Sequence, residues 1–200
     1  MRHSNLGYGM GRVFVAAALA ALIQAGTGVT PAAAIEAATP ANHPFWAIDE
    51  VRAGVFDHAL EDNVGERGVA LNLEVLGGRL PGSYGNSVLD IFLTPRPHLG
   101  TTIGFGKTDE FYWGLTWDAK LYGPLFLEAS FGGAVHDGPL ENGNNPAYGC
   151  QVNFRESASL GYSVGEHWKV MAEIDHMSNG NLCHPNHGLT NAGLRLGYRF

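Results

Sequence analysis

Residues 109–121 read DEFYWGLTWDAKL, a stretch in which large apolar side chains occupy every second position. Phe111, Trp113 and Trp117 share one parity, while Glu110 and Asp118 share the other. A period of two residues puts the apolar side chains on one face of a β-strand, whereas a helix would spread them around its circumference. The stretch therefore predicts a strand with one apolar and one polar face.

The same alternation recurs along the chain beyond residue 46. Glycine and proline separate the alternating segments, as in Tyr122-Gly123-Pro124, which is typical of turns between strands. The pattern predicts eight strands, and the third is expected to be broken or bent at Pro95 and Pro97. The expected bounds are 47–58, 67–78, 88–106, 109–121, 124–136, 149–163, 166–178 and 189–200.

The charged side chains gather on one face of these strands, and the other face is almost entirely apolar. A soluble barrel points its apolar face inward, whereas an outer-membrane barrel points it at lipid and keeps a polar interior. Long connections at 137–148 and 179–188 alternate with very short turns, which also favours the membrane class. The polar face holds Glu50, Arg52, Glu74, Arg96, Asp118, Lys120, Glu128, Arg155, Lys169, Glu173, Asp175, Arg195 and Arg199.

We therefore predict an all-β fold, an eight-stranded antiparallel transmembrane β-barrel of the Gram-negative outer membrane. A soluble periplasmic ligand carrier is disfavoured because its interior would have to be apolar. The ending Leu194 to Phe200 alternates in the same way and closes on an aromatic residue. This ending resembles the C-terminal strand signal that the barrel-assembly machinery reads, so that machinery is an expected partner.

The N-terminus has the order of a secretory signal peptide. Arg2 and Arg12 precede an apolar run over 13–23 and small residues ending at Ala34. We expect residues 1–34 to be the signal peptide, 35–46 a short leader and 47–200 the barrel. No other stretch has the roughly 18 consecutive apolar residues that a membrane-spanning helix needs.

The composition limits the partners. The chain has 200 residues and a formal net charge of −7, and no cluster of basic residues stands out. A nucleic-acid partner would require several cations to neutralise phosphates, so none is expected.

Two polar residues, His176 and Ser178, share the outward parity of Trp168, Val170 and Ile174. An imidazole and a hydroxyl on a bilayer face lose hydration unless they satisfy each other or serve a function. Residues two apart on a strand lie on one face with their Cα atoms about 7 Å apart, within reach of a hydrogen bond between the side chains. This is the arrangement in which a histidine base activates a serine nucleophile. The structural alternative is a pair of rim residues at headgroup level.

Cysteine and histidine residues near the last long connection give weaker signals. Cys150 and Cys183 enter an oxidising compartment, where pairing is allowed but not implied by their number. A bridge between them would tie this loop to residues 149–163 and fix Asn186. His184 and His187 form a His-x-x-His pair, but no third ligand has a clear spacing, so no metal site is predicted.

Several motifs together resemble the lipid A 3-O-deacylase family of the PagL type. They are His176-Met177-Ser178-Asn179, Pro185-Asn186-His187-Gly188-Leu189 and the ending Gly193 to Phe200, with weaker similarity upstream over most of the mature chain. The resemblance implies an outer-membrane esterase that removes the 3-O-linked acyl chain of lipid A through an acyl-enzyme. It implies Ser178 as nucleophile, His176 as general base, Asn186 with backbone N–H groups after Ser178 as oxyanion stabiliser, and no metal or cofactor.

The family's acidic residue aligns with Thr190, which has outward parity and cannot stabilise an imidazolium by charge. Glu156 is an alternative acid because it is the one acidic residue with the outward parity of 149–163. A short turn near 164–165 would set Glu156 opposite Ala172 or Ile174, diagonal to His176 or further away. The alternative function is a non-catalytic structural or adhesive barrel that has lost the family's acid.

Overall fold

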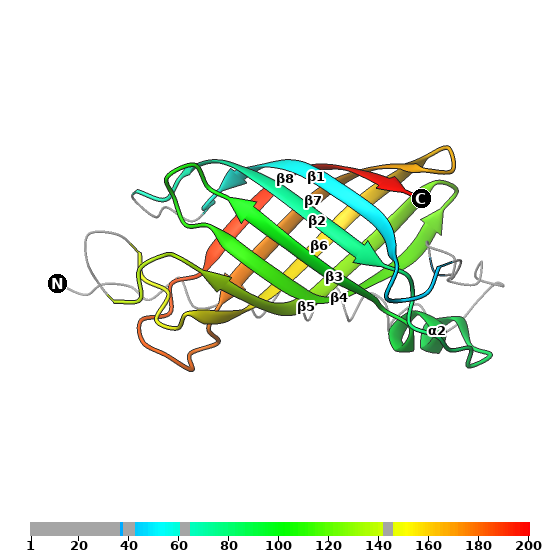
Figure 1. Ribbon diagram of the computed structural model, residues 1–200, viewed down its shortest axis with the longest axis horizontal. Helices are drawn as coiled ribbons and strands as arrows, with labels where there is room; N and C mark the ends of the chain where they lie inside the picture. Colours follow the sequence, from blue (N-terminus) through cyan, green and yellow to red (C-terminus); the bar gives the residue numbers. More distant parts are fainter. Residues whose placement is uncertain (1–36, 38–42, 61–64, 142–145) are drawn as a thin grey trace, which may run out of the picture. The chain divides into compact units, whose positions relative to one another are not determined.

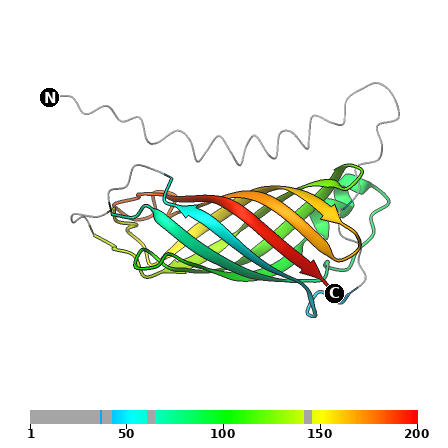
Figure 2. The ribbon, with the colours of Figure 1, turned by 90° about the horizontal axis from the view of Figure 1, so that it is seen from above.

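The computed structural model describes residues 37, 43–60, 65–141 and 146–200. The expected signal peptide and most of the expected leader lie outside the described residues. Within the described part, the strands form a closed barrel in the order of the sequence, and every neighbouring pair is antiparallel. β8 returns beside β1 to complete the ring (Figures 1 and 2). The elements are β1 (Ile48–His58), β2 (Gly68–Gly77), α2 (Ser87–Leu93), β3 (Arg96–Ile103), β4 (Glu110–Tyr122), β5 (Leu125–His136), β6 (Val152–Val164), β7 (Trp168–Ser178) and β8 (Leu189–Arg199).

The predicted eight-stranded barrel is thus confirmed, and so is the assignment of its two faces. Arg52, Arg155 and Arg195 are buried inside the barrel, whereas Phe111 and Leu194 are exposed on its outer surface. An eight-stranded barrel has an interior just wide enough for side chains to fill, so the buried charges must pair with one another.

The interior charges do pair. Arg52 lies 3.1 Å from Glu74, and Arg195 lies 3.1 Å from Glu74 and 2.7 Å from Glu173. Arg52 also forms ion pairs with Glu50 and Glu128. The network links side chains of β1, β2, β5, β7 and β8, so it holds the barrel together from inside.

The third predicted strand is wrong in its first half. Residues 87–93 form the short helix α2, and β3 begins only at Arg96. Asn86 caps the helix by accepting hydrogen bonds from the N–H groups of Val88 and Leu89. The segment SVLDIFL is apolar at too many consecutive positions to show the two-residue period, and Pro95 prevents its continuation as a helix.

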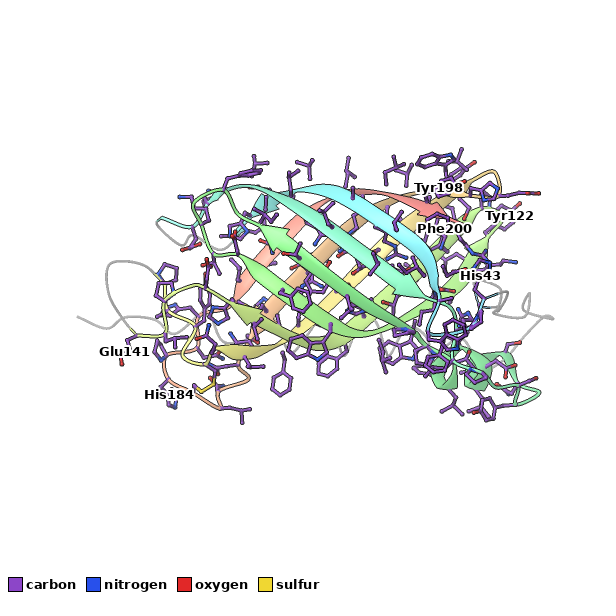
Figure 3. The ribbon with its side chains drawn as sticks, in the orientation of Figure 1. His43, Tyr122, Glu141, His184, Tyr198 and Phe200 are labelled. Atoms are coloured by element: carbon purple, nitrogen blue, oxygen red, sulfur yellow. A yellow bond between two sulfur atoms is a disulfide. The ribbon has the colours of Figure 1, made fainter. Side chains whose placement is uncertain are left out.

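The barrel has two distinct ends. The short-turn end holds the turns at 123–124 and 165–167, and the long-loop end holds the connections 137–151 and 179–188. Figure 3 shows Tyr122, Tyr198 and Phe200 at the short-turn end and His184 at the long-loop end. α2 lies in a long connection at the short-turn end, which the sequence pattern did not predict (Figure 1). Among the described residues, no helix is long and apolar enough to cross a membrane.

Candidate active site

His176 lies in a row of three polar side chains that crosses three strands on the outer surface of the barrel. Its strand β7 is paired so that His176 is directly opposite Thr190 of β8 and directly opposite Glu156 of β6. Directly opposite residues of an antiparallel pair face the same side, with Cβ atoms about 4.5–5.5 Å apart. The imidazole therefore lies between a hydroxyl and a carboxyl.

The contact with Thr190 is direct. The Nδ1 atom of His176 lies 2.8 Å from Oγ1 of Thr190, within hydrogen-bond distance. If the ring is neutral and donates through Nδ1, its Nε2 atom is the one that can accept a proton. Thr190 therefore orients the ring but contributes no charge to it.

The predicted partner of Glu156 on β7 is wrong, by two residues for Ile174 and by four for Ala172. The structure pairs Glu156 with His176, whereas the sequence argument set it opposite Ala172 or Ile174. The difference comes from the hairpin, where Val164 pairs with Trp168 and three residues rather than two form the turn. Gly165 supplies the positive φ of 65° that such a turn uses.

Glu156 is the acidic group that faces His176 on the outward side of β6. It is half-buried, it pairs directly with His176 of β7, and it lies opposite Phe131 of β5 on its other side. A carboxylate in apolar surroundings is stabilised strongly by a neighbouring cation because little water screens the pair. The pairing register thus puts a carboxyl group beside His176, which the position of Thr190 does not supply.

Ser178 follows His176 by two residues and is the last residue of β7. It is half-buried and lies opposite Phe154 of β6. Both side chains belong to the outward-facing set of β7, as the sequence predicted. The strand therefore presents a hydroxyl and an imidazole on one face, beside an aromatic neighbour.

Gly188 is a site residue that the sequence argument quoted within a motif but gave no role. A Cβ atom at this position would lie 2.3 Å from Cε1 and 2.9 Å from Nε2 of His176, so only glycine lets the loop backbone approach the ring this closely. Its signal in the sequence is the glycine directly before β8, at the end of the Pro-Asn-x-Gly motif. Gly188 and Thr190 therefore contact the imidazole from the same side of β7.

Asn186 shapes the loop that follows Ser178. Its Oδ1 accepts a hydrogen bond of 2.9 Å from the backbone N–H of Asn179, and its Nδ2 donates to Oδ1 of Asn181 at 3.2 Å. The N–H directly after Ser178 is therefore engaged by Asn186. The next backbone donors in the loop belong to Gly180 and Asn181, which both have positive φ.

Asn179 connects the two long loops, and the sequence argument quoted it within a motif but gave it no role. Its side chain is buried, and its Nδ2 donates to the backbone oxygens of Tyr148 at 2.7 Å and Pro185 at 3.0 Å. A disulfide joins Cys150 to Cys183 across the same contact, with Cα atoms 5.6 Å apart. The backbone after Ser178 is thus held from both sides.

A hollow of about 420 Å³ lies on the outer surface, and Asn179, the residue after Ser178, is part of its lining. Gly133 has no side chain, and the larger neighbours Trp113, Phe131 and Phe154 surround it, with Leu182 of the long loop at the edge. Phe154 is also the residue opposite Ser178. The hollow is therefore apolar and open to the surroundings of the barrel.

The two loop histidines lie apart from this arrangement. His184 and His187 are exposed, and His184 lies at the tip of the long-loop end in Figure 3. The described residues contain no group of three or more His, Cys, Asp or Glu side chains that could hold a metal ion. The site therefore combines the hydroxyl of Ser178 with the imidazole of His176 on one outward face of β7.

Comparison with known proteins gives a family. Residues 95–199 match the family model described as lipid A 3-O-deacylase (PagL). The fold is similar to the crystal structure of the outer membrane enzyme PagL, with a TM-score of 0.59, 19% sequence identity and coverage of 76% of this chain and 99% of that one.

Two further solved structures are similar at lower scores. The N-terminal β-barrel domain of Pseudomonas aeruginosa OprF has a TM-score of 0.47 and 13% identity, covering 76% of this chain and 98% of that one. A de novo designed transmembrane β-barrel has a TM-score of 0.44 and 10% identity, covering 77% and 98%. No curated protein matches the sequence significantly. Because the family model spans more than half of the chain and the fold agrees with it, this chain belongs to the lipid A 3-O-deacylase (PagL) family of outer-membrane β-barrels.

Proposed function

We propose that the protein hydrolyses the 3-O-linked acyl ester of lipid A, with Ser178 as nucleophile and His176 as general base. The observation that carries this proposal is the row Thr190, His176 and Glu156, with Ser178 two residues further along β7 on the same outward face. Membership of the deacylase family supplies the class of substrate. The row supplies a means of activating the serine.

The reaction proceeds in two stages. Oγ of Ser178 attacks the ester carbonyl carbon as its proton passes to Nε2 of His176, and the sugar oxygen then leaves with that proton as a free 3-hydroxyl. Water next attacks the acyl-enzyme, again giving a proton to His176. The fatty acid leaves, and the proton returns to Ser178.

Glu156 and Thr190 divide the work of the missing family acid. Thr190 holds the ring through Nδ1, and Glu156 provides the negative charge that stabilises the imidazolium formed in each stage. In a Ser-His-Asp triad one carboxylate both orients the imidazole and stabilises its positive charge. Here the two functions come from strands on opposite sides of β7.

The oxyanion donors come from the loop after Ser178. We place Asn186 in this group through the second N–H of its Nδ2 amide, since one N–H donates to Asn181, together with the backbone N–H groups of Gly180 and Asn181. The N–H of Asn179 is left out because Asn186 already engages it. Asn186 therefore also holds the loop in the shape that presents the other donors.

The hollow lined by Phe154, the residue opposite Ser178, is suited to the hydrocarbon chain of the substrate. Its aromatic walls and the small Gly133 give an apolar surface on the side of the barrel that faces lipid. In outer-membrane barrels the longer loops lie outside the cell, so the site faces the lipopolysaccharide of the outer leaflet. In this proposal the lipid of the outer membrane both surrounds the barrel and provides the substrate of the site.

A second function is favoured by one observation, the threonine at the family's acid position. If Glu156 cannot replace that acid, the protein is a structural or adhesive barrel without catalysis. The two functions are separated by mass spectrometry of lipid A from Gram-negative cells that express the chain.

The native chain should remove one 3-hydroxyacyl group, and Ser178→Ala should remove none. Ser163→Ala is a matched control at the short-turn end, where the backbone N–H of Ser163 donates to the carbonyl oxygen of Pro124. Full activity of Ser163→Ala with none in Ser178→Ala supports the esterase. Unchanged lipid A with all three chains folded in the membrane supports the structural function.

We also propose that the last strand is the recognition element for the barrel-assembly machinery. Phe200 is exposed at the short-turn end and packs edge-on against Tyr198, with ring centroids 5.4 Å apart. Removal of Phe200 should slow assembly of the barrel in cells without changing folding into detergent micelles. Equal assembly of both chains in cells would contradict this function.

A further inference from the structure

The helix α2 lies against the outside of the barrel rather than across its mouth. The indole Nε1 of Trp117 donates a hydrogen bond of 2.9 Å to the carbonyl oxygen of Phe92, a residue of α2. Trp117 has the outward parity of β4. Figure 1 shows α2 beside the strands at the short-turn end.

The exposed surface of α2 is apolar. Val88, Leu89 and Leu93 are 40%, 47% and 48% exposed, and Tyr84 stands just before the helix with 49% of its surface exposed. Soluble surfaces rarely gather so many apolar side chains in one small area without a partner. We therefore expect a lipid or protein partner to shield this apolar face of α2 from water.

Several polar groups in and around α2 form hydrogen bonds within the same connection. Asp90 accepts a hydrogen bond of 2.6 Å from the N–H of Tyr84, and Asn86 caps the first turn. The hydroxyl of Thr94 donates to the carbonyl oxygen of Asp90. With these bonds made, the helix can enter an apolar layer without leaving those polar groups unpaired.

The same end of the barrel carries aromatic side chains of the kind that mark a membrane interface. Trp168, Tyr162 and Phe200 are exposed there, and Trp168 packs against Tyr198 with ring centroids 4.9 Å apart. Membrane barrels have a girdle of aromatic residues at each interface. α2 adjoins the lipid-facing wall at the level of this girdle, so its apolar face continues a surface that already meets lipid.

We propose that α2 is an interfacial anchor, which inserts Val88, Leu89 and Leu93 into the phospholipid leaflet at the short-turn end. Interfacial helices bury an apolar face about 5–10 Å deep at the boundary of headgroups and acyl chains. A helix of seven residues cannot span the bilayer, so it rests in one leaflet. Because outer-membrane barrels keep their short turns in the periplasm, the leaflet is the inner, phospholipid one.

The test uses a fluorescent label at the centre of the helix. Leu89→Cys is labelled with NBD, which reacts with this thiol alone because Cys150 and Cys183 are joined. The full chain is reconstituted into vesicles of phosphatidylethanolamine and phosphatidylglycerol at 3:1, with or without brominated acyl chains. Glu166→Cys is the matched control, because it lies exposed in the turn between β6 and β7 at the same end.

We expect the label at position 89 to emit at shorter wavelength than the label at position 166 and to be quenched at least twofold more by brominated lipid. Equal emission and equal quenching would overturn the proposal. The proposal would also be overturned if brominated lipid did not quench the label at position 89 while its emission changed with the density of protein in the vesicles. That result would show that a second copy of the chain covers the apolar face of α2. The measurement does not depend on catalysis, so it stands apart from the proposed deacylase activity.

Discussion

At the scale of single residues, the register between β6 and β7 puts Glu156 beside His176, where we propose that it substitutes for the family's acid. Glu156→Gln keeps the shape of the side chain and removes its charge beside His176. We expect kcat to fall by about 100-fold or more, since a triad without its orienting acid loses up to about 10⁴ in kcat. Release of fatty acid from purified lipid A, measured on protein in micelles, gives the rate.

The control for this prediction is a rescue. Thr190→Glu restores an acid at the family position, so the double variant with Glu156→Gln should recover much of the lost activity. Thr190→Ala alone should have a smaller effect than Glu156→Gln, because it removes orientation but keeps the charge. Unchanged activity in Glu156→Gln would exclude Glu156 from catalysis.

Gly188 is a positioning residue for the same ring. Gly188→Ala would set a Cβ atom 2.3 Å from Cε1 of His176, so the imidazole must move. A displacement of about 1 Å at a reacting group can cost on the order of 100-fold in rate, and we expect a loss of this size with KM little changed. Gly68→Ala is the matched control, because a Cβ atom there would lie 3.7 Å from Cε of Lys107, which is ordinary van der Waals contact. A similar loss in both variants would point to general destabilisation instead.

At the scale of elements, the site depends on the contact between the two long loops. The disulfide between Cys150 and Cys183 and the hydrogen bonds of Asn179 fix the backbone after Ser178. We expect no free thiol in the unreduced protein and two after unfolding and reduction, as counted with a thiol reagent. Reduction in micelles should lower activity severalfold and leave the strands folded, because the bridge lies outside the sheet.

That prediction has its own control. Cys150→Ser together with Cys183→Ser should match the reduced protein and should not respond to reductant. Two free thiols in the unreduced native chain, or full activity in the double variant, would show that the bridge does not hold the site.

At the scale of the whole molecule, the barrel is stabilised from inside by paired charges. Arg52 is buried against Glu50, Glu74 and Glu128. Arg52→Met leaves these carboxylates short of a cation, and loss of one partner of a buried pair costs about 3–5 kcal/mol. The midpoint of urea unfolding in micelles should fall accordingly. Arg67→Met, at an exposed position, is the matched control and should shift the midpoint little.

The alternation of side chains was enough to predict much of this architecture. In β4 the pattern from Glu110 to Asp118 separates an inward from an outward face, because strand geometry alone imposes a period of two. The same parity predicted that His176 and Ser178 face outward together. These features are local, so they can be deduced from neighbouring residues without knowing what each strand pairs with.

Tertiary structure decided what parity could not. The three-residue turn at 165–167 sets the register between β6 and β7. This register decides that Glu156 faces His176 rather than Ala172 or Ile174. α2 was missed because an almost wholly apolar segment has no period, and its cap and its contact with Trp117 choose the helix. Gly188 gains its role only when the last loop folds back onto β7. Sequence determined the faces of the strands because they depend on local geometry, whereas register and loop contacts depend on partners distant in the chain, so only the folded molecule assembles the site.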